Sequence, residues 1–290
     1  MDDNLNDKRN PYMNAEGQRK LHTSIIAFVD ILGFKEIVRN AQKKGTSQEL
    51  FADFHQVIST WYKRDIVDSN RLFKMPFIGG KKDKYKIRIF TDCILIGCPI
   101  EKKERRHNFI EGSDEFLELL SKLYLFQLDM ANNGYLIRGA IALDELYMDD
   151  VIIYGNGVTE AYEAESIQAK YPRIILTKSA EDMFVKIDNS FAHQGRENYL
   201  RPYLNRDSDG LLFLNYLESI KIGDSDYQFV SELEKHKQML DNKLIQYRNK
   251  PHILEKYIWA ANYHNYFCNQ PPCYDDYQID LTKYQMQSIN

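Results

Sequence analysis

The sequence predicts an α+β fold, in which helices pack on one or both faces of a mixed β-sheet. Three observations support this fold class. The run Ile25–Phe34 consists of apolar and glycine residues around one carboxylate, which is typical of a buried strand. The segment Lys86–Gly97 places two apolar stretches around Thr91 and Asp92, as expected of a tight hairpin. Helical patterns alternate with such strands along most of the chain.

In the first part of the chain, helices follow the first strand. Gly33 ends that strand with a backbone able to turn sharply, and a helix is expected to begin at Lys35. From Ser47 to Tyr62 apolar residues recur every three or four positions, which predicts an amphipathic helix. A turn is predicted at 79–83, before the hairpin.

The middle of the chain contains the clearest helix, Asp114–Asn133, in which apolar side chains share one face and Asn-Asn-Gly follows as a stop signal. Two strands are expected next, Leu136–Leu143 and Val151–Tyr154, joined by a hairpin. Helix Val158–Lys170, strand Arg173–Leu176 and helix Ser179–Val185 are expected to follow. The last expected elements are a strand or buried turn at Leu211–Leu217 and the helices Tyr227–Tyr247 and Pro251–Phe267.

These elements divide the chain into three expected parts. Residues 1–21 form a polar arm, 22–205 form the main domain, and 206–290 form a mainly helical extension. The extension is expected to pack on the main domain or at a dimer contact, because aromatic residues occur on both of its helices.

Composition limits the classes of function. The net charge of −4 and the absence of a dense basic stripe argue against general nucleic-acid binding, and the mixed segment 102–107 is expected to be a solvated loop. No apolar leader or membrane-length run is visible, so a cytoplasmic protein that does not enter the membrane is expected. The pairs Cys93/Cys98 and Cys268/Cys273 are spaced more widely than typical zinc ligands and are expected to be buried free thiols.

Asp30 and Asp92 are the candidate functional residues. A carboxylate among apolar residues is costly to bury unless it has a partner. Two acids at strand ends, one of them beside a glycine turn that leads into a helix N-terminus, suit divalent cations and a phosphate chain. The alternative for Asp30 is a cap of the following helix. Hydrophobic periodicity does not by itself place the two acids side by side.

Four short blocks follow one another in the chain: Phe28–Phe34, Phe90–Asp92, Arg138–Ala142 and Tyr154–Ser166. In this order they resemble the class III nucleotidyl cyclases. Phe28–Phe34 is similar to their first metal-binding strand and phosphate loop, and Phe90–Asp92 to the hairpin that holds their second metal aspartate. Arg138–Ala142 resembles one of their strands, and Tyr154–Ser166 one of their helices. Each block is weak alone, but four in order are fairly specific. Within this superfamily the chain looks most like the bacterial anti-phage pyrimidine cyclases of the Pycsar type.

The resemblance implies a class III cyclase-like, ferredoxin-like sheet and catalysis with two Mg²⁺ or Mn²⁺ ions per active site. It makes Asp30 and Asp92 the metal ligands, with the carbonyl of Ile31 as a backbone ligand. The phosphates are expected to bind the backbone amides of Leu32, Gly33 and Phe34.

Other positions depart from the family pattern. Arg88 falls where purine cyclases carry a base-reading lysine, and Ile152 falls where they carry its acidic partner, so a pyrimidine carbonyl is favoured over adenine. The positions of the transition-state Asn and Arg fall on Thr159 and Glu163. A carboxylate cannot stabilise the developing negative charge. The candidate replacements for the missing cation are Arg138 and Arg173.

The expected reaction converts UTP or CTP to the 3′,5′-cyclic nucleotide and pyrophosphate, as a second messenger of anti-phage defence that acts on a cyclic-nucleotide-binding effector. The family also implies a homodimer with its active sites at the interface. One alternative is a degraded cyclase fold that binds a nucleotide or serves as a scaffold, which Thr159 and Glu163 favour. Another is a palm-type enzyme that joins nucleotides.

Overall fold

The computed structural model describes residues 10–14, 16–63, 85–101, 110–222 and 226–284. The chain forms two compact units, each assembled from separated segments. The sheet unit contains 1–31, 63–124 and 138–215, and the helical unit contains 32–62, 125–137 and 216–290. The turn predicted at 79–83 and the mixed segment 102–107 lie outside the described residues.

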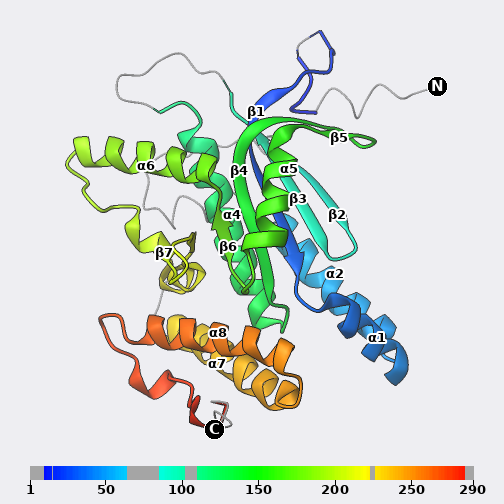
Figure 1. Ribbon diagram of the computed structural model, residues 1–290, viewed down its shortest axis with the longest axis vertical. Helices are drawn as coiled ribbons and strands as arrows, with labels where there is room; N and C mark the ends of the chain where they lie inside the picture. Colours follow the sequence, from blue (N-terminus) through cyan, green and yellow to red (C-terminus); the bar gives the residue numbers. More distant parts are fainter. Residues whose placement is uncertain (1–9, 15, 64–84, 102–109, 223–225, 285–290) are drawn as a thin grey trace. The chain divides into compact units, whose positions relative to one another are not determined.

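The sheet has the strand order β2-β3-β1-β4-β6-β8-β7, with β5 paired to β4 (Figure 1). Pairing is antiparallel between β1 and β3 and between β2 and β3, but parallel between β4 and β6. The mixed sheet with packed helices agrees with the predicted α+β class. The strands are β1 His22–Ile31, β2 Lys86–Phe90, β3 Cys93–Pro99, β4 Ile137–Met148, β5 Ile153–Tyr154, β6 Ile174–Leu176, β7 Leu204–Arg206 and β8 Leu212–Leu214.

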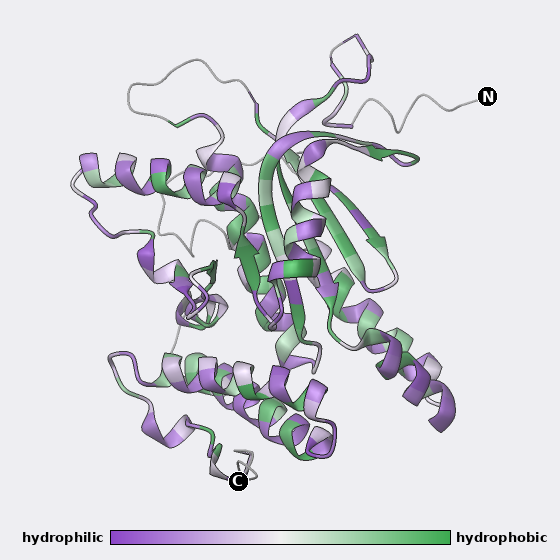
Figure 2. Cartoon of the chain, in the orientation of Figure 1, coloured by the Kyte–Doolittle hydropathy of each residue, from purple (hydrophilic) through white to green (hydrophobic). Residues whose placement is uncertain are grey.

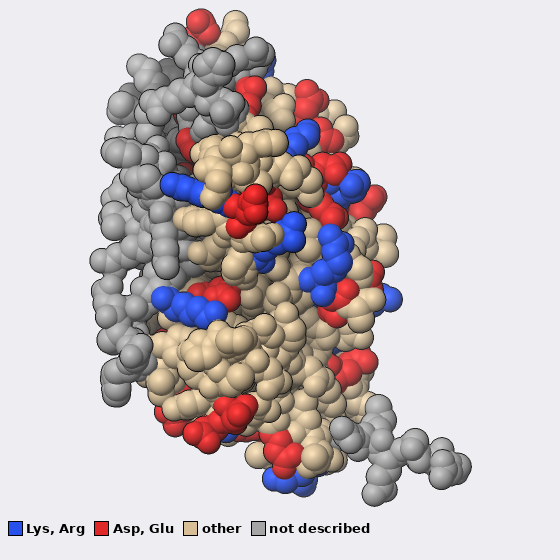
Figure 3. Space-filling model, turned by 90° about the vertical axis from the view of Figure 1, so that its left-hand side faces the viewer, with Lys and Arg blue, Asp and Glu red and all other residues tan. Residues whose placement is uncertain are grey.

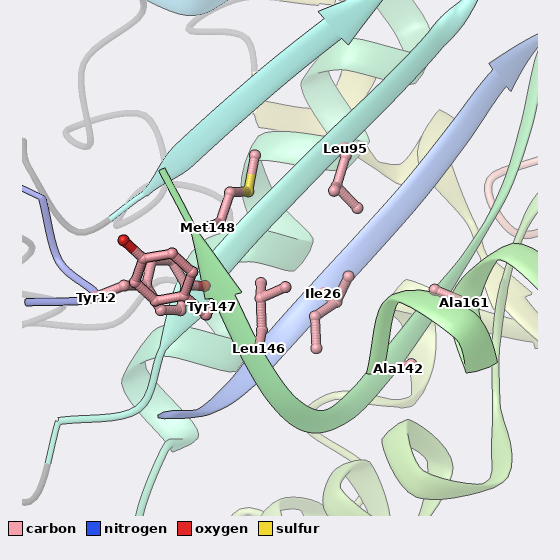
Figure 4. Packing of buried hydrophobic residues seen from close by; sticks show 8 residues of the cluster. All are labelled: Tyr12, Ile26, Leu95, Ala142, Leu146, Tyr147, Met148 and Ala161. Atoms are coloured by element: carbon pink, nitrogen blue, oxygen red, sulfur yellow. The ribbon is translucent and has the colours of Figure 1, made fainter. Parts of the chain in front are cut away.

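The core of the sheet unit lies along the apolar central strands, which Figure 2 shows as mostly hydrophobic. Tyr12 is fully buried in this core, although the sequence placed it in a loose polar arm over residues 1–21. The prediction is wrong for Tyr12, whose ring packs edge-on against Tyr147 at 6.2 Å, whereas residues 16–21 are exposed. The buried cluster in Figure 4 consists of Tyr12, Ile26, Leu95, Ala142, Leu146, Tyr147, Met148 and Ala161.

Two helices of the sheet unit differ from the expected ranges. The predicted helix Val158–Lys170 is an α-helix, α5 (Asn156–Glu163), followed by a π-helical turn, η2 (Ala164–Gln168). Helix α5 packs closely on β1, because a Cβ atom at Gly157 would lie 2.4 Å from the Ile26 side chain. Helix α6 (Lys178–His193) is longer than predicted.

The helical unit joins segments that are far apart in the sequence. Trp61 stacks on Phe126 with ring centroids 4.4 Å apart, and Phe54 packs against Tyr135 at 5.8 Å. These contacts hold 32–62 with 125–137, so the expected division at residue 205 does not match the compact units. The helices that contribute are α1 Phe34–Lys44, α2 Ser47–Lys63, the C-terminal part of α4 (Ser113–Asn132) from Leu125 onward, α7 Asp226–Tyr247 and α8 Pro251–Cys268.

The described surface has mixed charge. On the face shown in Figure 3, Lys and Arg residues lie among Asp and Glu residues. Among the described helices, each is too short or too polar to cross a lipid bilayer.

Candidate functional site

The structure brings Asp30 and Asp92 together, which periodicity alone did not predict. Asp30 is the penultimate residue of β1, and Asp92 lies in the turn between β2 and β3. The backbone N–H of Ile31 donates to the carbonyl of Asp92 at 3.0 Å, which fixes the turn beside the strand end. One ligand atom from each acid and from Cys93 lie within 4.8 Å of one another. The three side chains therefore form a group that can hold a metal ion.

Cys93 is a member of this group that the sequence analysis did not select. It is paired directly with Asp30 across the two antiparallel strands, and its Sγ lies 4.0 Å from Oδ1 of each aspartate. Burial, with the Asp30 carboxylate second, raises the pKa of this thiol to about 11. Its position directly after Asp92 at the start of a strand was the available signal.

The prediction of buried free thiols is correct for two of the four cysteines. All four cysteines are free, and Cys98 and Cys268 are buried as expected. Cys93 is half-buried and Cys273 is exposed, so the expectation is wrong for these two.

Arg138 connects the acids to a third carboxylate. Its Nε lies 3.2 Å from Oδ2 of Asp30 and 2.8 Å from Oε1 of Glu165. Its Nη1 also donates to the carbonyl of Ala169 at 3.4 Å. Glu165, only 3% exposed, was present in the block that resembles the cyclase helix, but it received no role. Arg138 therefore lies beside the predicted metal ligands, as expected of a catalytic candidate.

The site carries excess negative charge. Burial raises the pKa of Asp30, and the nearby Asp92 adds to this effect while Arg138 opposes it. Burial likewise raises the pKa of Glu165 against the influence of Arg138. Three carboxylates face one guanidinium, so a divalent cation would restore neutrality. Mg²⁺ prefers oxygen ligands and is commonly held by one or two carboxylates plus substrate phosphates, which Asp30 and Asp92 fit.

The predicted phosphate-binding amides are only partly available. The N–H of Leu32 donates to the carbonyl of Leu136 at 2.8 Å. This amide is therefore not available to a phosphate, and the prediction for Leu32 is wrong. Gly33 adopts the left-handed conformation, with φ 72°, as the N-cap of α1. This conformation is easy for glycine and strained for other residues. Gly33 and Phe34 remain the candidates at this helix N-terminus.

Arg88 is already bound to acceptors of the β4–β5 turn. Its Nε and Nη2 donate to the carbonyl of Asp149 at 3.2 and 2.7 Å, and Nη2 forms an ion pair with Asp150. Ile152 lies in the same turn, where its N–H donates to Oδ1 of Asp149 at 2.6 Å. The structure thus brings Arg88 close to the turn that contains Ile152. Asp150, which was not predicted, supplies an acidic partner for Arg88 two residues before the expected position.

The remaining predicted residues have different environments. Thr159 and Glu163 are exposed, four residues apart on α5. Arg173 is fully buried and forms ion pairs with Asp207 and Asp209. Its assignment as a substrate-binding cation is wrong, because two carboxylates compensate its charge inside the sheet unit.

The helical unit contains a separate open cavity of about 300 Å³. Asp53 and Gln56 of α2 lie on one side, and Asp129 and Asn133 on the other. None of the predicted site residues lines this cavity.

The comparisons with known proteins give no family: no protein-family model and no curated protein matches the chain.

Proposed function

We propose that the protein is a metal-dependent nucleotidyl cyclase that converts a pyrimidine nucleoside triphosphate to its 3′,5′-cyclic monophosphate and pyrophosphate. The observation that carries this proposal is the convergence of Asp30 and Asp92 at adjacent strand ends, with ligand atoms within 4.8 Å. The four blocks that resemble class III cyclases agree with it.

In this mechanism Asp30 and Asp92 would hold Mg²⁺ or Mn²⁺ through carboxylate oxygens, and the Ile31 carbonyl would be a further ligand. The bound ions would lower the pKa of the 3′-hydroxyl and neutralise phosphate charge. The amides of Gly33 and Phe34 would orient the phosphates at the start of α1.

Arg138 is the proposed transition-state cation. It lies 3.2 Å from Asp30, and α5 presents Thr159 and Glu163 where the family pattern has an amide and a guanidinium. A guanidinium next to the metal ligands can donate to a phosphate oxygen as charge develops.

The proposed base-reading residue is Arg88. Its donors now bind Asp149 and Asp150, so reading a base requires one of these contacts to be exchanged for a carbonyl oxygen of the pyrimidine. The exposed side chain of Ile152 in the same turn offers an apolar contact for a small ring. UTP and CTP are both retained as substrates.

A homodimer is part of the proposal. Large apolar side chains are exposed on β2 and around the β4–β5 turn, and Val151 is 89% exposed. Exposed apolar groups of this kind often mark protein interfaces. They are Ile89, Phe90, Val151, Ile152, Ile153 and Tyr154.

A second candidate function is a binding module that holds a nucleotide without turnover. The exposed Thr159 and Glu163 favour it, since neither can supply the positive charge that the reaction needs. Both candidates fit a role in second-messenger signalling, but only the first produces the messenger.

One experiment separates the two. The purified protein is incubated with each of the four ribonucleoside triphosphates and Mn²⁺, and pyrophosphate and cyclic nucleotide are measured. Release of pyrophosphate with cyclic UMP or cyclic CMP supports the cyclase, and a linear dinucleotide product would identify a nucleotide-joining enzyme instead. Nucleotide binding without any product would support the binding module. The double variant D30N/D92N is the control for contaminating activity.

A further inference from the structure

The π-helical turn η2 holds Arg138 from two directions. The N–H of Ala169 donates to the carbonyl of Ala164 at 3.0 Å, a bond across five residues that defines the turn. The same turn carries the buried side chain of Glu165, and the carbonyl of Ala169 accepts from Arg138 at 3.4 Å. π-Helical turns are rare and frequently occur at functional sites.

Two carboxylates lie close to the same nitrogen of Arg138. Its Nε–H donates to Oδ2 of Asp30 at 3.2 Å, while Oε1 of Glu165 lies closer to the same nitrogen, at 2.8 Å. The other oxygen of Glu165 accepts from Ser166 at 2.9 Å, which fixes the carboxylate. Oδ1 of Asp30, the oxygen that does not accept from Arg138 Nε, lies 4.0 Å from Sγ of Cys93.

We propose that Glu165 is a positioning residue that acts through Arg138 and keeps Asp30 available for the divalent cation. This inference rests on the metal-dependent function proposed above. If Glu165 carried no charge, Asp30 alone would compensate the guanidinium. The ion pair between Asp30 and Arg138 would then compete directly with the cation for the same carboxylate. A second carboxylate on Arg138 weakens that competition.

The test is the affinity for Mn²⁺ alone, measured from the paramagnetic resonance signal of free Mn²⁺ without nucleotide. The variant E165Q keeps the shape of the side chain and removes its charge, and its Mn²⁺ dissociation constant is expected to rise about tenfold. The variant E165D keeps the charge and is expected to stay within about threefold of the unmodified protein. The matched control is E160Q on α5, because it removes the charge of a carboxylate whose hydrogen-bond donor is Ser179, at 2.9 Å.

The variant R138M separates positioning from a direct effect of charge. If Glu165 acts through Arg138, E165Q has no further effect on Mn²⁺ affinity once Arg138 is removed. An equal loss in both backgrounds would show that Glu165 acts on the cation directly and would overturn the proposal, as would unchanged affinity in E165Q. If E165Q does not fold, R138M and R138M/E165Q still test the proposal: equal Mn²⁺ affinity agrees with action through Arg138, and a further loss in the double variant overturns it.

The outcomes also distinguish this inference from the proposed function. Mn²⁺ binding that depends on Glu165 through Arg138, without any nucleotide product, would refute the cyclase and leave the inference intact. Formation of the cyclic product, with the Mn²⁺ affinity of E165Q equal to that of the unmodified protein, would support the cyclase and refute the role of Glu165. A failure of the unmodified protein to bind Mn²⁺ would refute both.

Discussion

A buried pair of histidines in the helical unit makes its stability depend on pH. Nδ1 of His236 lies 2.9 Å from Nδ1 of His264, and Nε2 of His236 lies 2.8 Å from the hydroxyl of Tyr216. Nε2 of His264 lies 2.9 Å from the carbonyl of Tyr277. A carbonyl only accepts, so this nitrogen carries the hydrogen. Burial favours the neutral form of both rings, and in that form His236 donates to His264 and accepts from Tyr216.

The sign of the pH effect follows from this neutrality. Burial lowers the pKa of His264 from 6.5 to about 4 and the pKa of His236 well below its usual value. Below pH 6.5 the unfolded chain binds protons that the folded chain does not. The stability contributed by the neutral rings is therefore complete above pH 6.5 and is lost as the pH falls toward 4. For His264 alone the loss over this window is about 3 kcal/mol, or about 2 kcal/mol between pH 6.5 and 5.

Tryptophan fluorescence reports this unit selectively, because both tryptophans of the chain, Trp61 and Trp259, lie in it. Urea unfolding at pH 7.5, 6, 5.5 and 5 gives the free energy of unfolding at each pH. The variant His264→Asn keeps an acceptor for His236 but does not titrate. It is expected to be less stable at pH 7.5 and to show a shallower pH dependence, by up to about 1.4 kcal/mol per pH unit below 6.5. Equal slopes for both proteins would refute the neutral-pair argument.

Four further predictions concern the site and the sheet. Asp30→Asn or Asp92→Asn is expected to reduce turnover to background while the circular dichroism spectrum stays unchanged; near-normal turnover with a retained metal requirement would contradict the metal assignment. Arg88→Ala is expected to reduce the preference for pyrimidine over purine triphosphates roughly tenfold in kcat/KM, and ATP or GTP as the best substrate of the unmodified protein would contradict this pocket. Val151→Asp is expected to shift a dimer toward monomer in light scattering and to lower specific activity, whereas a fully active unmodified monomer would exclude a shared site. Gly139→Ala is expected to lower stability in urea by about 2 kcal/mol, because its Cβ would lie 2.6 Å from a backbone oxygen of β1; no loss would mean that the strands separate easily there.

The sequence predicted local features of the fold better than distant contacts. The strand around Asp30 and the hairpin around Asp92 follow from side-chain patterns, and the structure contains both. The pairing of Asp30 with Cys93 is a matter of register between strands, which no local pattern specifies. Register depends on the whole sheet and on its turns.

The incorrect assignments have related physical causes. Arg173 was selected for its charge, but its partners Asp207 and Asp209 come from a turn more than thirty residues later. Glu165 lay within a predicted regular helix, and its role depends on a π-helical turn that periodicity does not reveal. The acidic partner Asp150 was not predicted, because the family pattern places this acid at the position of Ile152, two residues away.

The discontinuous make-up of the helical unit has a consequence for synthesis on the ribosome. Its first segment, 32–62, is translated long before its last, which begins at residue 216. During translation, helices α1 and α2 are made before α7 and α8, which belong to the same unit. Domains whose segments are contiguous can fold as soon as they emerge. Here α1 and α2 are made before the third segment of their unit, so nascent chains interrupted before residue 216 lack α7 and α8 and are expected to aggregate more readily than chains that contain the whole unit.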